Sequence, residues 1–230
     1  MNRYEVVLFD LDGTITDSAP GIMASIRYAL DDLGIDSPDD ATMRAFLGPP
    51  LMVTFTEHFM LSEADSTRLV GKYRERYHGV GERENAVFPG VAEILSDLNR
   101  RGVMIAVATS KPTASATRIL EHFELEGYFT FIGGAEMHGG RQHKADVIAH
   151  TLEELGIEDI SGRPIIMVGD REHDVLGAAH FGIPTIGVLW GYGSVEELER
   201  AGAAAIVHDT AGLRVELLDP DKPRHCKIRT

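Results

Sequence analysis

The sequence has little cysteine, the residue whose disulfides are typical of proteins from oxidising compartments. Its 230 residues include one cysteine, Cys226, so no disulfide can form within the chain. A chain without internal disulfides is typical of a reducing compartment. Cys226 lies in a polar stretch, and we expect it to be a surface thiol and not a nucleophile.

Long apolar runs are also missing. No stretch approaches the roughly 18 apolar residues needed to cross a bilayer. The first apolar run, Val6–Phe9, is short and is followed by carboxylates, which does not fit a secretory signal peptide. We therefore expect a cytoplasmic protein with no membrane partner.

Positive charge is scarce. The chain has 22 Lys and Arg against 36 Asp and Glu, a formal net charge of -14. Nucleic-acid binding depends on Lys/Arg stripes that face the phosphate backbone, and none is visible, so we expect no nucleic-acid partner. An anionic substrate would need a cation or a local positive site.

What the sequence does have is a series of short apolar runs rich in Val and Ile. Continuous runs of this kind are typical of strands buried on both faces of a parallel sheet. Helical patterns between them predict an α/β fold, a doubly wound Rossmann-like parallel sheet. The expected strands are residues 6–9, 103–108, 129–132, 165–168, 185–189 and 204–207, and the expected helices between them are residues 91–100, 113–123, 144–155, 174–180 and 195–200.

Residues 18–84 break this alternation, because only helical patterns occur there. They predict an all-helical insertion into a core made of residues 1–17 and 85–218. Within the insertion, Gly48-Pro49-Pro50 is expected to form a turn, since proline cannot continue a helix. Residues 219–230 contain two prolines and no apolar period, which predicts a flexible tail.

Acidic side chains follow two of the expected strands. Asp10 and Asp12 follow residues 6–9, and Asp170 follows residues 165–168. The carboxyl ends of parallel strands form the ligand-binding edge of such a sheet. Close carboxylates repel unless a cation lies among them, and oxygen ligands suit Mg²⁺, which often also binds a substrate phosphate. Asp174, four residues after Asp170, is placed to orient a ligand or a metal-bound water.

Hydroxyl and basic groups complete the candidate site. Thr109 and Ser110 follow another expected strand, where a hydroxyl and free amides favour phosphate binding. Lys144 begins a helix and would place a fixed positive charge against phosphate. Each residue alone has an ordinary explanation, such as a helix cap or a surface lysine. Taken together, however, these residues are all expected at the same edge of the sheet, which favours a single site.

Four stretches together carry a family resemblance. They are Asp10-Leu11-Asp12-Gly13-Thr14, Thr109-Ser110, Lys144 and Gly169-Asp170-Arg171-Glu172-His173-Asp174. In this order they resemble the four motifs of the haloacid dehalogenase superfamily of phosphohydrolases, over about residues 4–218. The helices of residues 18–84 look like the cap of its phosphoglycolate-phosphatase-like branch.

The resemblance implies roles for the acidic residues. Asp10 would be the nucleophile and form an aspartyl-phosphate. Asp12 would protonate the leaving oxygen and then deprotonate the hydrolytic water. The side chains of Asp10 and Asp170, with the backbone carbonyl of Asp12, would bind Mg²⁺, and Asp174 would support these ligands.

The resemblance also implies that the Thr109 hydroxyl and the Ser110 amide hold the phosphoryl oxygens. Lys144 would neutralise charge between the phosphate and the nucleophile. The sequence departs from the family pattern at Lys111, since Asn or Gly is more frequent shortly after the Thr/Ser residue. We interpret Lys111 as a solvated residue at a helix start, with contact to the substrate as the alternative. We interpret His143 and His173 as surface groups or groups behind the ligands.

These features predict an Mg²⁺-dependent phosphomonoester hydrolase, a monomer or homodimer, acting on a small phosphorylated metabolite such as phosphoglycolate or a nucleoside monophosphate. Two alternatives stay open: a protein tyrosine kinase- or phosphatase-like member of the same branch, and a non-catalytic regulator that binds a phosphorylated ligand. The cap would supply specificity, and its candidate substrate-facing residues are Arg44, Gly48, Pro49, Met52 and Phe55.

Overall fold

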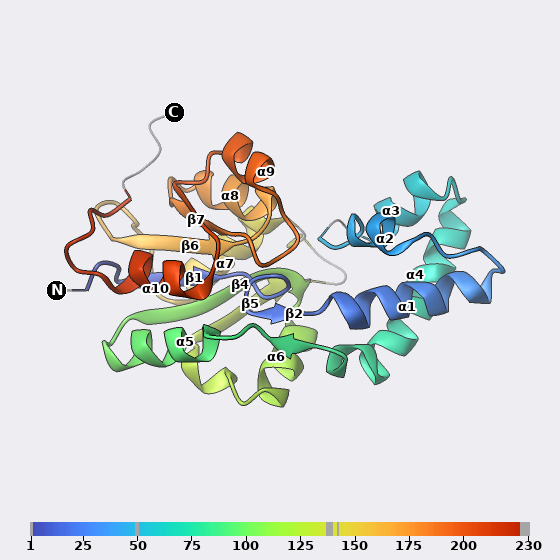
Figure 1. Ribbon diagram of the computed structural model, residues 1–230, viewed down its shortest axis with the longest axis horizontal. Helices are drawn as coiled ribbons and strands as arrows, with labels where there is room; N and C mark the ends of the chain where they lie inside the picture. The colour runs from blue at the N-terminus through green and yellow to red at the C-terminus, as the bar shows by residue number, and fades with distance from the viewer. Residues whose placement is uncertain (1, 49–50, 137–139, 142, 226–230) are drawn as a thin grey trace. The chain divides into compact units, whose positions relative to one another are not determined.

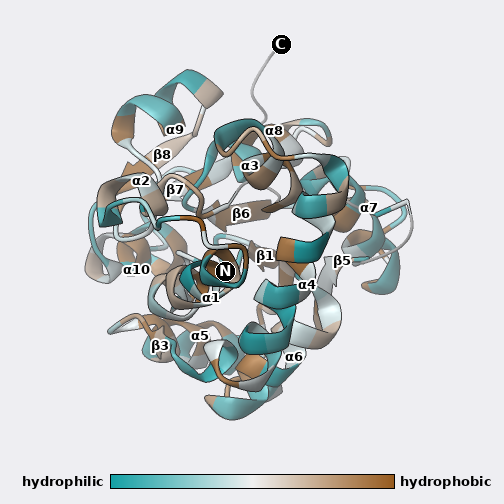
Figure 2. Ribbon diagram, turned by 90° about the vertical axis from the view of Figure 1, so that its right-hand side faces the viewer, coloured by the Kyte–Doolittle hydropathy of each residue, from teal (hydrophilic) through white to brown (hydrophobic). Residues whose placement is uncertain are grey.

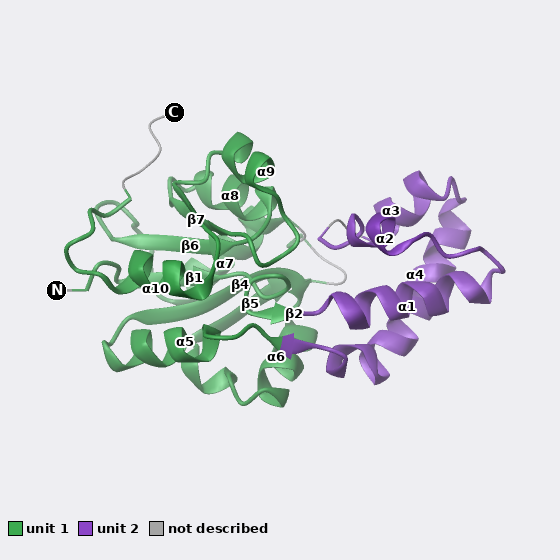
Figure 3. Cartoon of the chain, viewed as in Figure 1, with its two compact units in different colours: residues 1–16, 87–230 green, residues 17–86 purple. Residues whose placement is uncertain are grey.

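The computed structural model describes residues 2–48, 51–136, 140–141 and 143–225. It divides into two compact units, one made of residues 1–16 and 87–230 and the other of residues 17–86 (Figure 3). The chain passes between them at two short strands, β2 (Thr16–Asp17) and β3 (Ala86–Val87), which form a two-stranded sheet.

The larger unit is built on a six-stranded sheet with the order β5-β4-β1-β6-β7-β8, in which the described strand pairs are parallel (Figure 1). The strands are β1 (Val6–Phe9), β4 (Met104–Pro112), β5 (Phe131–Ala135), β6 (Ile165–Gly169), β7 (Thr185–Val188) and β8 (Ala205–Val207). The predicted α/β class and the parallel Rossmann-like sheet are confirmed.

Helices cover both faces of this sheet, which explains why β1 is apolar at every position. Val7 and Phe9 belong to one apolar core cluster, whereas Val6 and Leu8 belong to another. Successive side chains of a strand point to opposite faces, so each face carries its own core. The helices are α5 (Val91–Arg100), α6 (Thr113–His122), α7 (Lys144–Glu154), α8 (Glu172–Ala179), α9 (Val195–Ala201) and α10 (Thr210–Leu218).

The smaller unit is helical, with α1 (Ala19–Asp32), α2 (Asp40–Arg44), α3 (Leu51–His58), α4 (Glu63–Gly79) and the 3₁₀ turn η1 (Gly81–Arg83). The buried residues of α4 are Ser66, Leu69, Tyr73 and Tyr77, which lie three or four residues apart. This spacing puts them on one face of the helix, and Figure 2 shows hydrophilic and hydrophobic segments alternating along it. Among the described residues, no helix has both the length and the hydropathy that a bilayer crossing requires.

Helix α10 and the described residues after it contact the start of the chain. Arg3 donates a hydrogen bond of 2.6 Å to the carbonyl of Glu216, and Arg224 donates one of 3.2 Å to the carbonyl of Asn2. The flexible tail expected at residues 219–230 stays a prediction, because residues 226–230, Cys226 among them, lie outside the described residues.

Candidate active site

The ends of β1 and β6 bring three carboxylates together. These strands are parallel neighbours, with Phe9 opposite Val168, so Asp10 and Asp170 follow at the same sheet edge. One carboxylate oxygen from each of Asp10, Asp170 and Asp174 lies within 4.8 Å of the other two, and all three residues are buried. The residues predicted from the first and fourth motifs therefore meet in one cluster.

Lys144 connects two members of this carboxylate cluster. It is the first residue of α7. Its Nζ lies 2.8 Å from Asp10 Oδ1 and 2.7 Å from Asp174 Oδ1. The Asp10 contact has hydrogen-bond geometry, whereas Asp174 Oδ1 accepts no hydrogen bond among the described residues. A single ammonium thus pairs with two of the three acids of the cluster.

The Asp170 carboxylate is held between two glycine backbones. Thr14 Oγ1 donates a hydrogen bond of 3.1 Å to Oδ1, and the backbone N–H of Tyr192 donates one of 2.7 Å to Oδ2. A Cβ on Gly13 would lie 2.3 Å from Asp170 Oδ2, and one on Gly191 would lie 2.4 Å from the same atom. The glycines therefore leave just enough space for the carboxylate.

Gly13→Ala is expected to destabilise the protein by about 2–4 kcal/mol, because it adds a clash with Asp170 to the cost of a positive φ. The φ of Gly13 is +83°. Gly102→Ala is a matched control, since Gly102 has a φ of +69° and open space around its Cβ position; it should cost only about 1 kcal/mol. Urea unfolding measures both values. Equal losses would show that Asp170 does not limit the space at Gly13.

Burial and mutual repulsion shift the ionisation of the cluster. Burial raises the pKa of Asp10 to about 6, although Lys144 opposes the shift. Burial, then Asp174 and Asp10, raise the pKa of Asp170 well above its usual range. Burial acts to lower the pKa of Lys144, but the carboxylates of Asp10 and Asp174 outweigh it and raise that pKa above its ordinary value. Lys144 therefore stays charged and leaves an excess of negative charge.

This cluster suits a divalent cation. Its donors are carboxylate oxygens, the ligands that hard cations such as Mg²⁺ prefer. The raised carboxylate pKa values are the sign of a site that lacks compensating positive charge. The three acids that the structure groups are Asp10, Asp170 and Asp174, whereas the sequence grouped Asp12 with Asp10 and Asp170 and placed Asp174 behind the ligands. The metal contact predicted from the resemblance for Asp12 is through its backbone carbonyl and stays a prediction.

The side chain of Asp12 pairs with Lys111, and here the sequence interpretation is wrong. Lys111 is a buried residue of β4, not a solvated one at a helix start, because β4 extends to Pro112 before α6 begins. Its Nζ lies 3.0 Å from Asp12 Oδ1 and 2.7 Å from Oδ2. The alternation of side chains along a strand gave only a partial signal, because Thr109 and Lys111 stand two apart, as Asp10 and Asp12 do. The register shift that follows Thr109 is not visible in the sequence.

Thr109 and Ser110 lie at the end of β4, the other neighbour of β1. Thr109 is buried, and its Oγ1 accepts a hydrogen bond of 3.2 Å from the Lys111 N–H. Ser110 is exposed. The two histidines near the motifs, His143 and His173, are both exposed, which agrees with a surface position.

The candidate residues of the helical unit differ from one another. Arg44 and Gly48 are exposed and Met52 is half-buried. Phe55 is fully buried and lies with its ring centroid 6.2 Å from that of Phe59, so it is a core residue of this unit and substrate contact is disfavoured. For Arg44, Gly48 and Met52 substrate contact stays a prediction. Pro49, the remaining candidate, lies outside the described residues.

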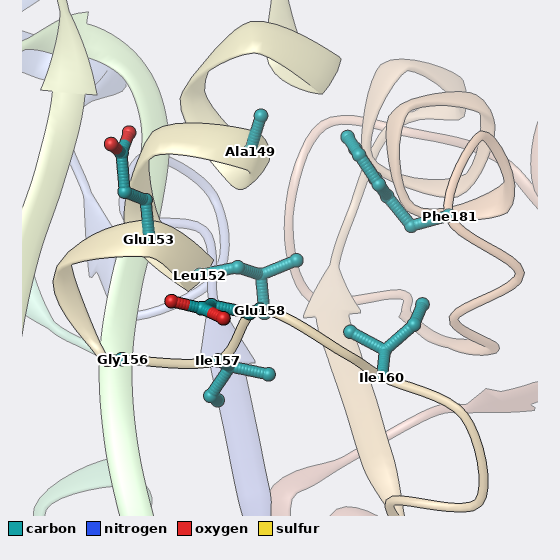
Figure 4. A pocket seen from close by; sticks show the side chains of 8 residues that line it. All are labelled: Ala149, Leu152, Glu153, Gly156, Ile157, Glu158, Ile160 and Phe181. Atoms are coloured by element: carbon teal, nitrogen blue, oxygen red, sulfur yellow. The ribbon is translucent and has the colours of Figure 1, made fainter.

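A separate cavity of about 340 Å³ opens beside α7 and the segment around Phe181 (Figure 4). Its walls are mainly apolar, with Glu153 and Glu158 at its edge, and none of the predicted site residues lines it. The lining residues are Ala149, Leu152, Glu153, Gly156, Ile157, Glu158, Ile160 and Phe181. The buried carboxylates, and not this cavity, form the candidate active site.

Comparisons with known proteins agree with this geometry. The model of the haloacid dehalogenase-like hydrolase family matches residues 7–188. The chain is 43% identical over 212 residues to a 5'-nucleotidase from Pseudomonas aeruginosa, which covers 92% of this chain and 95% of that protein. It is 41% identical over 208 residues to tyrosine-protein kinase PtkA from Mycobacterium tuberculosis, covering 89% of this chain and 68% of the kinase.

A solved structure, that of a predicted phosphatase from Clostridium acetobutylicum, is similar to the chain with a TM-score of 0.85 and 43% identity, over 92% of this chain and 96% of that one. The family match spans most of the chain, and the sheet edge carries the acidic cluster. The chain therefore belongs to the haloacid dehalogenase-like hydrolase family and is a phosphatase.

Proposed function

We propose that the protein is an Mg²⁺-dependent phosphomonoesterase that acts through a phosphoenzyme formed on Asp10. The observation that carries this proposal is the buried cluster in which Lys144 Nζ contacts Asp10 at 2.8 Å and Asp174 at 2.7 Å, next to Asp170. The arrangement brings a carboxylate suited to act as a nucleophile, a fixed ammonium and carboxylates suited to hold a metal ion to the carboxyl ends of β1 and β6.

In the first step, an oxygen of Asp10 attacks phosphorus and the bond to the leaving oxygen breaks. Asp12 gives its proton to that oxygen, since an alkoxide is a poor leaving group without one. Lys144 offsets the repulsion between an anionic nucleophile and an anionic phosphoryl group. The Thr109 hydroxyl and the Ser110 N–H would hold phosphoryl oxygens and so orient the group for attack.

In the second step, Asp12 accepts a proton from water while the water oxygen bonds to phosphorus. The bond between Asp10 and phosphorus breaks, which releases phosphate and regenerates both carboxyl groups in their starting states. When bound by Asp10, Asp170 and the Asp12 carbonyl, with Asp174 behind them, Mg²⁺ would supply further positive charge against the phosphoryl oxygens.

The proposed substrate is a nucleoside 5'-monophosphate. Support comes from the relative that shares 43% identity along nearly the whole chain and is named a 5'-nucleotidase. The helical unit, residues 17–86, is proposed to act as the cap that recognises the part of the substrate beyond the phosphate. Arg44, Gly48 and Met52 are its candidate contacts, and phosphoglycolate is the competing substrate.

A phosphomonoester panel tests this proposal. With Mg²⁺, kcat/KM for nucleoside 5'-monophosphates should exceed that for phosphoglycolate by at least about tenfold, because the cap would bind the nucleoside. EDTA should lower turnover of p-nitrophenyl phosphate by at least about 100-fold, and added Mg²⁺ should restore it. Absence of turnover for every ester would contradict the phosphatase, whereas a preference for phosphoglycolate would contradict only the substrate.

The similarity to a tyrosine-protein kinase keeps a second candidate open. A phosphoenzyme on Asp10 could in principle pass its phosphoryl group to a tyrosine hydroxyl instead of to water. Incubation with ATP labelled in the γ-phosphate and a tyrosine-containing peptide separates the two, because a kinase labels the peptide and a phosphatase releases phosphate. A purely regulatory role is disfavoured by the presence of both Asp10 and Asp12.

A further inference from the structure

Lys111 is a buried cationic side chain that the mechanism above does not use. Its side chain is 5% exposed and that of Asp12 is 22% exposed. The Nζ atom donates hydrogen bonds to both oxygens of Asp12, at 3.0 Å and 2.7 Å. It therefore contacts the one carboxyl group that must exchange a proton with the substrate.

An irregularity in β4 delivers Lys111 to this place. Thr109 lies opposite Gly134 of β5, but the next partnered residue, Pro112, lies opposite Ala135, so the register shifts between them. Ser110 and Lys111 are thus extra residues in β4 relative to β5. Extra residues in a strand re-aim side chains and occur often beside active sites. Here Ser110 is turned outward and Lys111 inward.

The backbone around Lys111 is equally constrained. Its N–H donates to the side chain of Thr109 at 3.2 Å. A Cβ on Gly134 would lie only 2.6 Å from the Lys111 carbonyl oxygen, so the neighbouring strand approaches closely at this point. A fixed backbone and a buried stem leave the Lys111 ammonium little freedom to leave Asp12.

Two hydrogen bonds from one ammonium fix the orientation of a carboxyl group. A free Asp side chain rotates, and a misplaced acid loses much of the advantage of intramolecular proton transfer. Residues that support a reacting group through hydrogen bonds hold it in the productive geometry. The contact with Lys111 is suited to this task because it engages both oxygens of Asp12.

We propose that Lys111 is a positioning residue that holds the Asp12 carboxyl group for proton transfer; this inference rests on the proposed phosphatase mechanism. The proton moves from Asp12 to the leaving oxygen and returns to Asp12 from water. Lys111 keeps its own proton throughout, so neither step needs a further reactant.

The proposal predicts a dependence on the leaving group. A p-nitrophenolate departs without a proton, whereas an alkoxide needs one from Asp12, and general acid catalysis contributes roughly 10²–10⁴-fold. The value of kcat/KM reports on transition-state stabilisation relative to free enzyme and substrate. Loss of Lys111 should therefore lower kcat/KM most for esters with basic leaving groups.

The test compares the wild-type enzyme with Lys111→Met, using aryl phosphates of graded leaving-group pKa and one alkyl phosphate. We expect kcat/KM to fall by about 100-fold for the alkyl ester and by less than about fivefold for p-nitrophenyl phosphate. Lys111→Arg should restore part of the loss. Lys222→Met removes a more exposed lysine from the same unit and should change neither value.

An equal loss across the series would overturn the proposal, because a merely structural role does not distinguish leaving groups. Asp12→Asn gives a second measurement: adding Lys111→Met to it should lower kcat/KM no further, since Lys111 acts through Asp12. A further drop of the full size would assign Lys111 another role. Failure of the phosphatase proposal itself would show separately, as absence of turnover by the wild-type enzyme.

Discussion

Asp10→Asn is expected to lower kcat for p-nitrophenyl phosphate by a factor on the order of 10⁴ or more, because an amide cannot act as the nucleophile. The substitution keeps the shape of the side chain. Its amide oxygen can still accept the hydrogen bond that Lys144 donates to Asp10 at 2.8 Å. The fold should therefore be retained, and far-UV circular dichroism together with steady-state kinetics measures both properties.

Asp36→Asn is a matched control, since Asp36 is an exposed acid outside the cluster and its loss should leave kcat unchanged. A second experiment detects the phosphoenzyme directly. Wild-type enzyme quenched in acid during turnover of a ³²P-labelled ester should retain label that hydroxylamine releases, and the Asp10→Asn variant should retain none. Activity of that variant near the wild-type level would remove Asp10 as the nucleophile.

Asp170→Asn is expected to have opposite effects on activity and stability. Turnover should fall by at least about 100-fold, because the site would lose one of its proposed metal ligands. Without metal, however, the variant should be about 1–3 kcal/mol more stable than the wild type, since one of three repelling carboxylates is gone. The hydrogen bonds can survive: the amide oxygen can accept from the Tyr192 N–H, and the amide NH₂ can donate to Thr14 Oγ1.

The stability difference should depend on pH with a definite sign. The pKa of Asp170 in the folded protein is raised well above its usual range by burial, Asp174 and Asp10. An acid of this kind favours folding while it is protonated, and that stability is lost as pH rises from its unfolded pKa through its folded pKa. The advantage of Asp170→Asn should accordingly be small near pH 4 and grow as the pH rises.

Urea unfolding in EDTA at several pH values measures this difference, and saturating Mg²⁺ should reverse it by stabilising the wild type alone. A variant that is less stable than the wild type at every pH would show that the Asp170 carboxylate contributes more through its hydrogen bonds than it costs through repulsion.

Part of this arrangement could be predicted from the sequence because it depends on local patterns. Residues 6–9 and 165–168 are apolar at every position, and helices on both faces of the sheet bury them. Asp10 and Asp170 follow directly, so their meeting at one edge required only the parallel topology. Lys111 could not be placed in this way, because its direction depends on a register shift against β5, which starts 20 residues later.

Helix α10 was also absent from the prediction. Its two most buried residues are Leu213 and Leu217, four apart, and Gly212 weakens the helical pattern before them. The helix starts because the Asp209 side chain accepts a hydrogen bond from the Gly212 N–H at 2.7 Å, and it is held by packing against the core. Tertiary contacts of this kind are not visible in a short window of sequence.

The central place of β1 in the sheet has a consequence for biosynthesis. Val6 pairs with Met104 on one side and with Ile165 on the other, so this strand is translated before both of its partners and waits for them. At 5–20 residues per second, about 10–30 s separate the synthesis of Asp10 from that of Asp174. Val6–Phe9 has neither neighbour of its final sheet until β4 is translated, and β6 follows later still. The candidate active site is therefore completed only by delayed association of strands.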